Sequence, residues 1–357
     1  MSSTFPIFRL PLVALRVVIN HFHLNHLVIV SFCSQRAQRI LRLLRKKNPK
    51  TCIEAKYSSM AEISLTDTNL RDLLPERPDE VSSRVQFSKV CLKEKSQLSE
   101  GDQKTEFVNV GAFLIPFSKS LNENEEVISN FYFEERFEGL KVMLEFFTWF
   151  FETSIFKSLL NSHMYPDQIR NFLDYVMTQQ NSLDYCHVKC EKTSENEIQR
   201  ILDVCNFVNI FVLDVRPTPE FQYLFTFERD SIAVLNGFWF NFDNLLQIDC
   251  RCCQIWGTKL TNLQMNQYLK RWISGSFEKL ERLSVEMEVI DLGVLLADLN
   301  AVNFPEGEKR IYKNQCNRNV TIGYGFDIRR NDNTLATILH HGGNIVSKQF
   351  HMLVWPK

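Results

Sequence analysis

The chain has 357 residues, with 41 basic and 42 acidic side chains and a net charge of −1. This length gives room for about two domains. The balanced charge excludes a general polycation, although residues 1–53 hold nine Arg or Lys and no acid. Ten irregularly spaced cysteines are typical of a reducing compartment in which most thiols are buried.

The N-terminus predicts neither a secretory signal nor a membrane span. Residues 17–35 carry no formal charge, but Asn20, His21, His23, Asn25 and His26 interrupt the run. A span needs about 20 predominantly apolar residues, and no small-residue cleavage site follows the run. We therefore expect a cytoplasmic or nuclear protein that makes no membrane contact.

Residues 5–47 predict three short helices. Leu10-Pro11 can open the first, because proline is tolerated at a first helical position, and Asn25 and Ser34 can cap the second and third. Apolar residues at helical spacing mark the inner faces of the first and third helices: Leu12, Leu15, Ile19 and Phe22, then Ala37, Ile40, Leu41 and Leu44. The other face of the third helix is basic: Arg36, Arg39, Arg42, Arg45 and Lys46.

A helical unit this small cannot bury a full core alone. Its apolar residues are either a docking surface for a partner or a face that packs on the C-terminal domain, and the periodicity leaves both open. The basic face suits nucleic acid, an anionic membrane or an acidic protein partner. It is equally compatible with an ordinary solvated helix face.

Residues 48–130 predict a β-rich connector without any chemical motif. Its strand candidates are short alternating segments at 52–57, 61–65 and 84–92 and an apolar, β-rich segment at 107–117. The polar residues 93–104 predict an exposed hairpin loop.

From residue 131 onward, helix and strand patterns alternate. A Phe-rich helix after Glu134 contains Leu140, Met143, Leu144, Phe147, Phe150, Phe151 and Ile155. Later helices follow Pro166 and the capping-box pairs Ser194/Glu197 and Thr261/Gln264. Strand candidates lie at 183–190, 208–213, 221–227 and 232–242.

Three strand phrases share one pattern: Val208-x-x-Phe211-x-Leu213, Leu245-x-x-Ile248-x-Cys250 and Leu280-x-x-Leu283-x-Val285. Their starts lie 37 and 35 residues apart, at 208, 245 and 280. Repeated strand–helix units of this kind stack into a curved α/β layer. The pattern indicates an irregular leucine-rich-repeat-like domain, with a compact α/β sandwich as the alternative.

No constellation for catalysis, cofactor or metal binding emerges. Cys250 and Cys252 point to one side of a strand and Cys253 to the other, so buried small hydrophobes are favoured over zinc ligands. His340-His341 near Gly342-Gly343 has no matching nucleophile or third ligand. Phosphate-loop and hydrolase-elbow motifs are missing. We expect a protein that is not an enzyme and needs no cofactor.

The N-terminal segment resembles an F-box. The residues that carry the resemblance are Leu10-Pro11, Ala14-Leu15, Val18, Leu27, Ser31, Ser34-Gln35-Arg36-Ala37 and Ile40. The C-terminal half is similar to the F-box-associated domain of the large nematode F-box family. Its matching phrases include Leu245-Leu246-x-Ile248-Asp249-Cys250, Leu260-Thr261-Asn262, Leu269-Lys270-x-Trp272-Ile273 and Leu280-Glu281-x-Leu283.

The resemblance implies an α+β chain with an F-box at 5–47, the connector at 48–130 and a substrate-binding, leucine-rich-repeat-like domain at 131–357. It implies a substrate-recruiting subunit of an SCF-type cullin-RING ubiquitin ligase, with a protein substrate that the sequence does not name. The Skp-type adaptor is then expected to bind six residues: Leu10, Pro11, Leu15, Val18, Leu27 and Val30.

Two other functions stay open. The run from Arg36 to Lys47 could bind nucleic acid, although it lacks the interleaved aromatic residues of single-strand binders. The chain could also be a repeat-type interaction module with a degenerate F-box.

Overall fold

The computed structural model describes residues 7–67, 88–98, 105–121, 127–162, 167–191, 194–313, 319–339 and 348–356. The chain has an α+β fold and divides into two compact units. Unit 1 contains the described residues up to Asn161, and unit 2 those from Ser162 onward. The division falls later in the chain than the predicted boundary at 130/131, because the helix and strand that follow residue 131 pack with the connector.

Unit 1 begins with a helical layer. A 3-10 turn (η1, Ile7–Arg9) precedes α1 (Leu12–Asn20), α2 (Leu24–Ser31) and α3 (Gln35–Leu44). Pro11 stands at the N-cap of α1, and the Ser34 hydroxyl accepts the Ala37 N–H at 3.1 Å. The predicted cap of the second helix is wrong: α2 already begins at Leu24, with His23 at its N-cap and no side-chain cap bond.

The sheet of unit 1 has the order β7-β1-β2-β3-β6-β5-β4. Its strands are β1 (Thr51–Tyr57), β2 (Ala61–Asp67), β3 (Ser88–Glu94), β4 (Glu106–Val110), β5 (Phe113–Leu121), β6 (Val127–Phe133) and β7 (Ile155–Ser162). The first two predicted strands are confirmed. The loop expected from residue 93 is wrong at its start, since β3 reaches Glu94, continues as a 3-10 turn (η3, Lys95–Gln97) and pairs in parallel with β6. The rest of that prediction, residues 99–104, lies outside the described residues.

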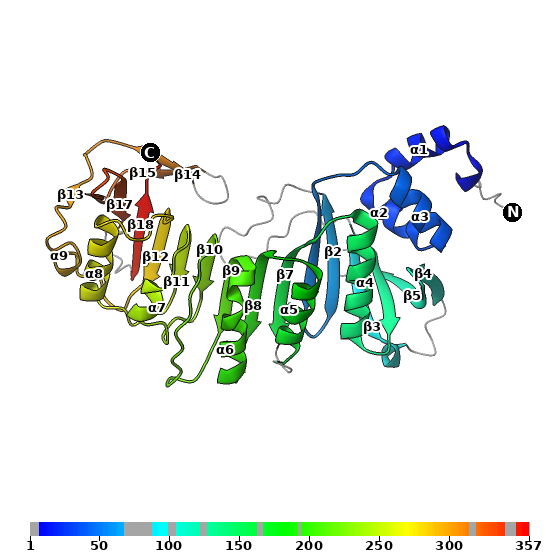
Figure 1. The fold of residues 1–357 in the computed structure, drawn as a ribbon, viewed down its shortest axis with the longest axis horizontal. Helices are drawn as coiled ribbons and strands as arrows, with labels where there is room; N and C mark the ends of the chain where they lie inside the picture. The colour runs from blue at the N-terminus through cyan, green and yellow to red at the C-terminus, as the bar shows by residue number, and fades with distance from the viewer. Residues whose placement is uncertain are drawn as a thin grey trace. The chain divides into compact units, whose positions relative to one another are not determined.

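The predicted segment 107–117 is not one strand but a hairpin, β4–β5. Gly111 allows the turn, because its φ of 56° lies in the left-handed region that glycine adopts without strain. Helix α4 (Arg136–Phe151) then packs on β1, β2, β3 and β6 (Figure 1). It ends where Glu152 turns to φ 53°, so Ile155 starts β7 instead of extending the helix as predicted.

The strands of unit 2 follow one another in the order β8-β9-β10-β11-β12-β18-β17-β16-β13. The parallel members are β8 (Leu183–Cys190), β9 (Val208–Val215), β10 (Ser231–Val234), β11 (Cys252–Ile255) and β12 (Arg282–Glu286). The antiparallel members are β13 (Val302–Asn303), β16 (Phe326–Arg329), β17 (Leu335–Leu339) and β18 (Gln349–Val354). A separate pair contains β14 (Arg310–Lys313) and β15 (Asn319–Ile322).

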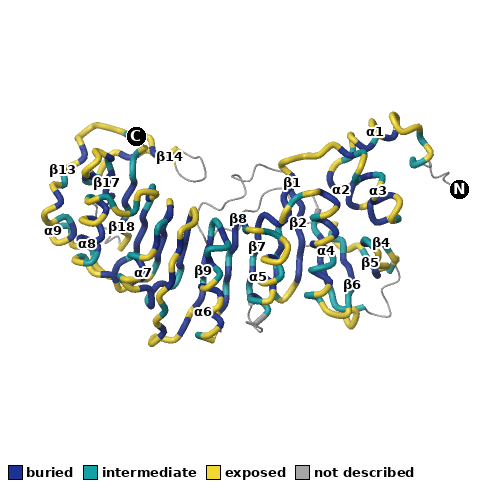
Figure 2. The backbone as a smooth tube through the Cα atoms, viewed as in Figure 1, coloured by how far each residue is buried: buried dark blue, intermediate teal, exposed yellow. Residues whose placement is uncertain are grey.

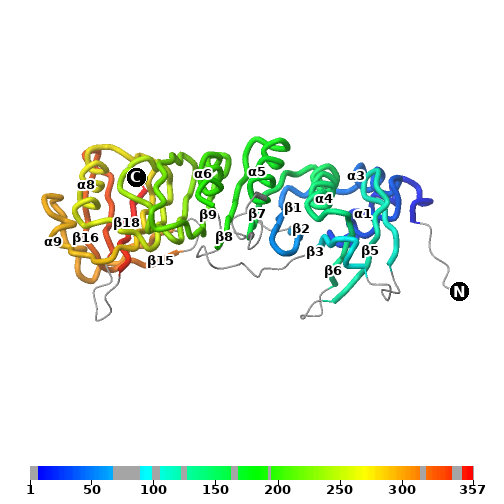
Figure 3. Tube along the Cα trace, turned by 90° about the horizontal axis from the view of Figure 1, so that it is seen from below, coloured from blue at the N-terminus to red at the C-terminus, as the bar shows by residue number. Residues whose placement is uncertain are grey.

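Helices flank the parallel strands along the described part of the chain: one precedes β8, three lie between successive strands and one follows β12. They are α5 (Asp167–Gln179), α6 (Glu195–Asp203) with the turn η4 (Cys205–Phe207), α7 (Phe242–Leu246), α8 (Asn262–Ile273) and α9 (Leu292–Leu295). Figure 3 shows α5 and α6 on the same side of strands β8 and β9. The Ser194 and Thr261 caps are confirmed, because each hydroxyl accepts a backbone N–H three residues on.

The repeat phrases are only partly correct. Two buried rows cross the parallel strands in register: Cys186, Phe211, Ile232, Cys253 and Leu283, then Val188, Leu213, Val234, Ile255 and Val285. Figure 2 shows these strands as largely buried. The middle phrase is wrong, since Leu245 lies in α7 and the strand starts at Cys252. The predicted strand at 221–227 is also wrong, and only a single bridge joins Phe227 to Ile248.

Candidate functional site

The N-terminal helices use part of their apolar surface inside unit 1. Phe32, at the end of α2, packs its ring 5.1 Å from that of Phe131 and 5.5 Å from that of Phe146. Its carbonyl accepts the Asn109 N–H, and the Gln38 side chain donates to the Asn109 carbonyl at 2.9 Å. The helical layer therefore rests on strands β4 and β6 and helix α4.

The six residues that the resemblance assigns to adaptor binding do not all reach the surface. Leu15 and Leu27 are buried, so they support the layer from inside. Pro11 is exposed, and Leu10, Val18 and Val30 are partly exposed. Around them the layer exposes further apolar side chains: Leu12, Val13, Val17 and Ile29. We call Leu10–Val13 and Val17 the α1 surface.

The basic face of α3 is not simply solvated. Arg45 is 7% exposed, and its guanidinium donates to the Phe150 carbonyl at 3.2 and 2.7 Å. Burial lowers the pKa of Arg45. Arg42 lies 4.6 Å over the Trp149 ring and pairs with Glu152 at 3.4 Å, and Lys47 pairs with the same carboxylate. Three of the cations predicted for nucleic acid thus hold α3 to the end of α4.

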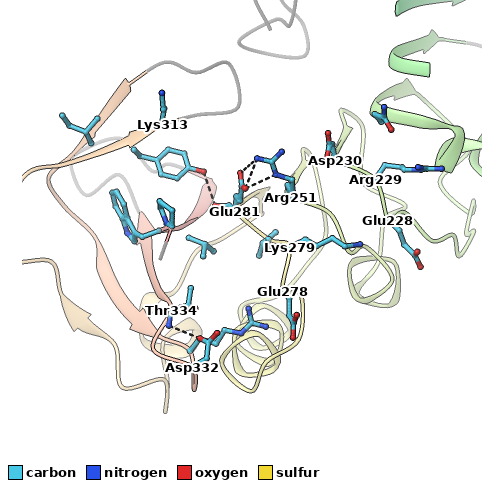
Figure 4. A pocket seen from close by; sticks show the side chains of 18 residues that line it. Glu228, Arg229, Asp230, Arg251, Glu278, Lys279, Glu281, Lys313, Asp332 and Thr334 are labelled. Carbon is cyan, nitrogen blue, oxygen red and sulfur yellow. Dashed lines mark hydrogen bonds and ion pairs between the residues drawn. The ribbon is translucent and has the colours of Figure 1, made fainter. Parts of the chain in front are cut away.

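A second site candidate is a hollow of about 990 Å³ in unit 2, here called the β10–β12 hollow (Figure 4). Its charged wall comes from the segments that immediately precede three parallel strands. Glu228, Arg229 and Asp230 precede β10, Arg251 precedes β11, and the run 278–281 precedes β12. The other wall contains residues of β14 and of the end of β18.

Backbone bonds place these segments side by side. The N–H groups of Arg251 and Cys252 donate to the Asp230 carbonyl, and those of Glu281 and Arg282 donate to the Arg251 carbonyl. The Val354 N–H then donates to the Glu281 carbonyl. Because these bonds join the starts of β10, β11 and β12 to one another and to the end of the antiparallel β18, the side chains of these segments line a single edge of the sheet.

Most cations of the hollow already have partners. Arg251 forms a bidentate pair with Glu281 at 2.9 and 3.1 Å, and this hydrogen bonding raises the pKa of Arg251. Lys279 pairs with Asp249 at 3.0 Å, which raises the pKa of Lys279. Arg330 is buried, donates to the Gly275 and Ser276 carbonyls and lies 5.6 Å over the Trp272 ring.

The sequence did not indicate this hollow. Arg251 and Arg330 stand far apart in the chain, and no sequence motif links them. The available signal was positional: charged residues stand directly before each strand of the parallel set, so they gather at one sheet edge. That signal needs the correct strand starts, which the phrase at Leu245 misplaced.

The cysteine-rich run is part of the core. Cys250, Cys252 and Cys253 are buried, and burial raises the pKa of Cys252 to about 12. The Cys250 thiol donates to the Cys252 carbonyl at 3.1 Å. Among the described residues, no group of three His, Cys, Asp or Glu could hold a metal ion. The pair His340-His341 lies outside the residues that the structure describes.

Within the described part of the chain, no helix combines the length and apolarity needed to cross a bilayer. Comparison with known families finds one match: residues 220–285 match the model of a family described as "F-box associated". No curated protein and no solved structure matches the chain. The matched stretch contains the segments before β10, β11 and β12, so most of the charged wall of the β10–β12 hollow lies within it.

Proposed function

We propose that this chain is a non-enzymatic, substrate-recruiting subunit of an SCF-type cullin-RING ubiquitin ligase, in the cytoplasm or nucleus. The observation that carries the proposal is the F-box-associated match at 220–285, a stretch whose segments line the β10–β12 hollow. A helical layer of three helices precedes it at the N-terminus, as an adaptor-binding F-box would. In this role the hollow contacts the target and the helical layer contacts the Skp-type adaptor.

The α1 surface is the part of the helical layer that suits adaptor docking. Leu12 is 68% exposed and Val13 79%, values at which a large apolar side chain gains much by burial in an interface. Leu10 and Pro11 lie at the start of the same surface. Leu15 and Leu27 take part indirectly, because they fix the helices that present it.

The fold of unit 2 supports the leucine-rich-repeat-like form of the proposal. Its parallel strands follow each other in chain order from β8 to β12, and two buried rows repeat along them. Stacked units of this kind present a continuous edge for a protein target. The mechanism is one of effective concentration: a target held near the ubiquitin-carrying enzyme reacts in a quasi-intramolecular step.

The test is co-purification of the full chain with a Skp-type adaptor. The variant Leu10→Ala/Pro11→Ala should lose the complex, because a few central apolar anchors dominate such interfaces. The matched control is Leu263→Ala/Val289→Ala, two residues of unit 2 that are 60% and 66% exposed. A complex that survives in both variants, or no complex with a folded wild-type chain, contradicts the adaptor role.

A further inference from the structure

In the described part of the β10–β12 hollow, most of the cations already have partners, whereas several of the carboxylates do not. Arg251, Lys279 and Arg330 are held by Glu281, by Asp249 and by backbone carbonyls, respectively. An anion such as a phosphoryl group would have to displace these partners. A phosphate-binding pocket instead presents free, converging donors. The hollow is therefore poorly suited to a phosphorylated target.

Three of its carboxylates are in the opposite condition, whereas Glu281 pairs with Arg251 and Asp332 accepts the Thr334 N–H. Glu228, Asp230 and Glu278 are exposed, and none of them forms an ion pair with any residue that the structure describes. They come from the segments before β10 and before β12, which backbone bonds link through the intervening segment at Arg251. Three carboxylates at one edge favour a cationic side chain, since complementary charges steer and orient a partner.

The facing wall is apolar. Ile311 on β14 is 65% exposed, and Val354, Trp355 and Pro356 continue the surface at the end of β18. Trp355 is fixed there, because its indole N–H donates to the Thr337 hydroxyl at 2.8 Å and its ring meets Tyr312 edge-on at 5.9 Å. This wall can receive an aliphatic or aromatic side chain without reorganisation.

Figure 4 shows how the charged side chains of the hollow are distributed. Lys313 lies on one side of the Arg251–Glu281 pair, and Glu228 and Asp230 lie on the other. Lys313 forms no ion pair among the described residues, and Arg229 donates its Nε to the Asn206 carbonyl. The cation Lys313 thus borders the apolar wall, so a bound basic side chain is directed toward the carboxylates and away from that wall.

We propose that the β10–β12 hollow binds an unphosphorylated peptide segment in which a Lys or Arg stands close to a large apolar residue. The basic side chain contacts Glu228, Asp230 and Glu278, and the apolar one contacts Ile311 and Trp355. The proposal rests on the proposed function, because it names the class of target that the recruiting subunit recognises.

The experiment is selection of short random peptides on the immobilised full chain, beside a second library that carries a fixed phosphoserine. Enriched peptides should contain Lys or Arg near an aromatic or aliphatic residue, and the phosphoserine library should not enrich. Binding should weaken at higher ionic strength, because the contacts are exposed charge pairs.

The decisive variant is Glu228→Gln/Asp230→Asn/Glu278→Gln, which removes charge but keeps size. Affinity for the enriched peptides should fall about tenfold, as expected for several exposed charge pairs together. The matched control Glu220→Gln/Glu288→Gln/Glu306→Gln changes three exposed carboxylates that do not line the hollow. It should leave affinity unchanged.

Enrichment of acidic or phosphorylated peptides, equal binding by both triple variants, or no enrichment overturns the proposal. Peptide binding is measured without the adaptor, whereas the proposed function is tested by co-purification. A chain that binds the adaptor but no basic peptide refutes only the target class. A chain that binds basic peptides but no adaptor refutes the ligase role.

Discussion

At the scale of single residues, Arg45 is a charged side chain that is buried inside unit 1 and stabilises it. It is buried against the rings of Phe150 and Phe151 and donates twice to the Phe150 carbonyl. Arg45→Ala would leave that carbonyl without its partner and remove the packed aliphatic stem. We expect the opening free energy of the α3–α4 contact to fall by about 2–3 kcal/mol.

Hydrogen exchange of the full chain, read on peptides from α3 and from the end of α4, measures this loss. Arg39→Ala is the control, since Arg39 is exposed on the same helix and should change stability by less than about 0.5 kcal/mol. Equal exchange in the two variants would mean that Arg45 is a surface residue in solution.

The same residue shows what helical periodicity can and cannot predict. Ser34 was correctly expected as a cap, because an N-cap depends on local backbone geometry. Arg45 was expected on a basic face open to a partner or to solvent, and Leu15 among docking residues. Both expectations needed knowledge of which element covers each face. That depends on the contacts of Phe32 and Gln38 with β4, β6 and α4, which lie far along the chain from them.

At the scale of elements, α4 lies close to the sheet because of one glycine. A Cβ on Gly139 would stand 2.4 and 2.5 Å from ring atoms of Phe133 on β6 and 3.0 Å from its Cβ. Alanine is the better helix former by about 1 kcal/mol, yet overpacking costs about 1–3 kcal/mol. We therefore expect Gly139→Ala to destabilise unit 1, seen as a lower urea midpoint.

A double variant tests the cause. Phe133→Ala removes the Cγ and ring atoms that the new Cβ would meet, so Gly139→Ala should cost less in the Phe133→Ala background than in the wild type. Glu145→Ala is the helix-propensity control, because Glu145 is exposed on α4. Additive effects of the two substitutions would place the strain elsewhere.

Element boundaries were predictable where a local signal specified them. Thr261 and Gln264 cap α8 as expected, and β1, β8 and β9 occupy the expected segments. The phrase at Leu245 failed because Asn241 and Asn244 form a capping box that starts α7. A short run of apolar residues spaced three apart fits both a short helix and a strand. The strand position is decided by long-range pairing, in which Cys253 lies beside Ile232 and Leu283.

At the scale of the whole molecule, the docking surface and the target site are expected to act in one chain. The α1 surface belongs to unit 1 and the β10–β12 hollow to unit 2. If recruitment works by effective concentration, each must be intact in the same molecule. The two variants, Leu10→Ala/Pro11→Ala and Glu228→Gln/Asp230→Asn/Glu278→Gln, should then each lower ubiquitin transfer to a reporter that carries an enriched basic peptide.

Mixing the two variants supplies the sharper result. Their mixture should give no more ubiquitin transfer than the sum of the separate reactions. The α1-surface variant still binds the reporter but not the adaptor, and the hollow variant still binds the adaptor but not the reporter. The Leu263→Ala/Val289→Ala chain should transfer at the wild-type rate and shows that the assay is intact. Restored transfer in the mixture would mean that the two sites cooperate between chains, so that an assembly of several copies, and not the single chain, brings target and adaptor together.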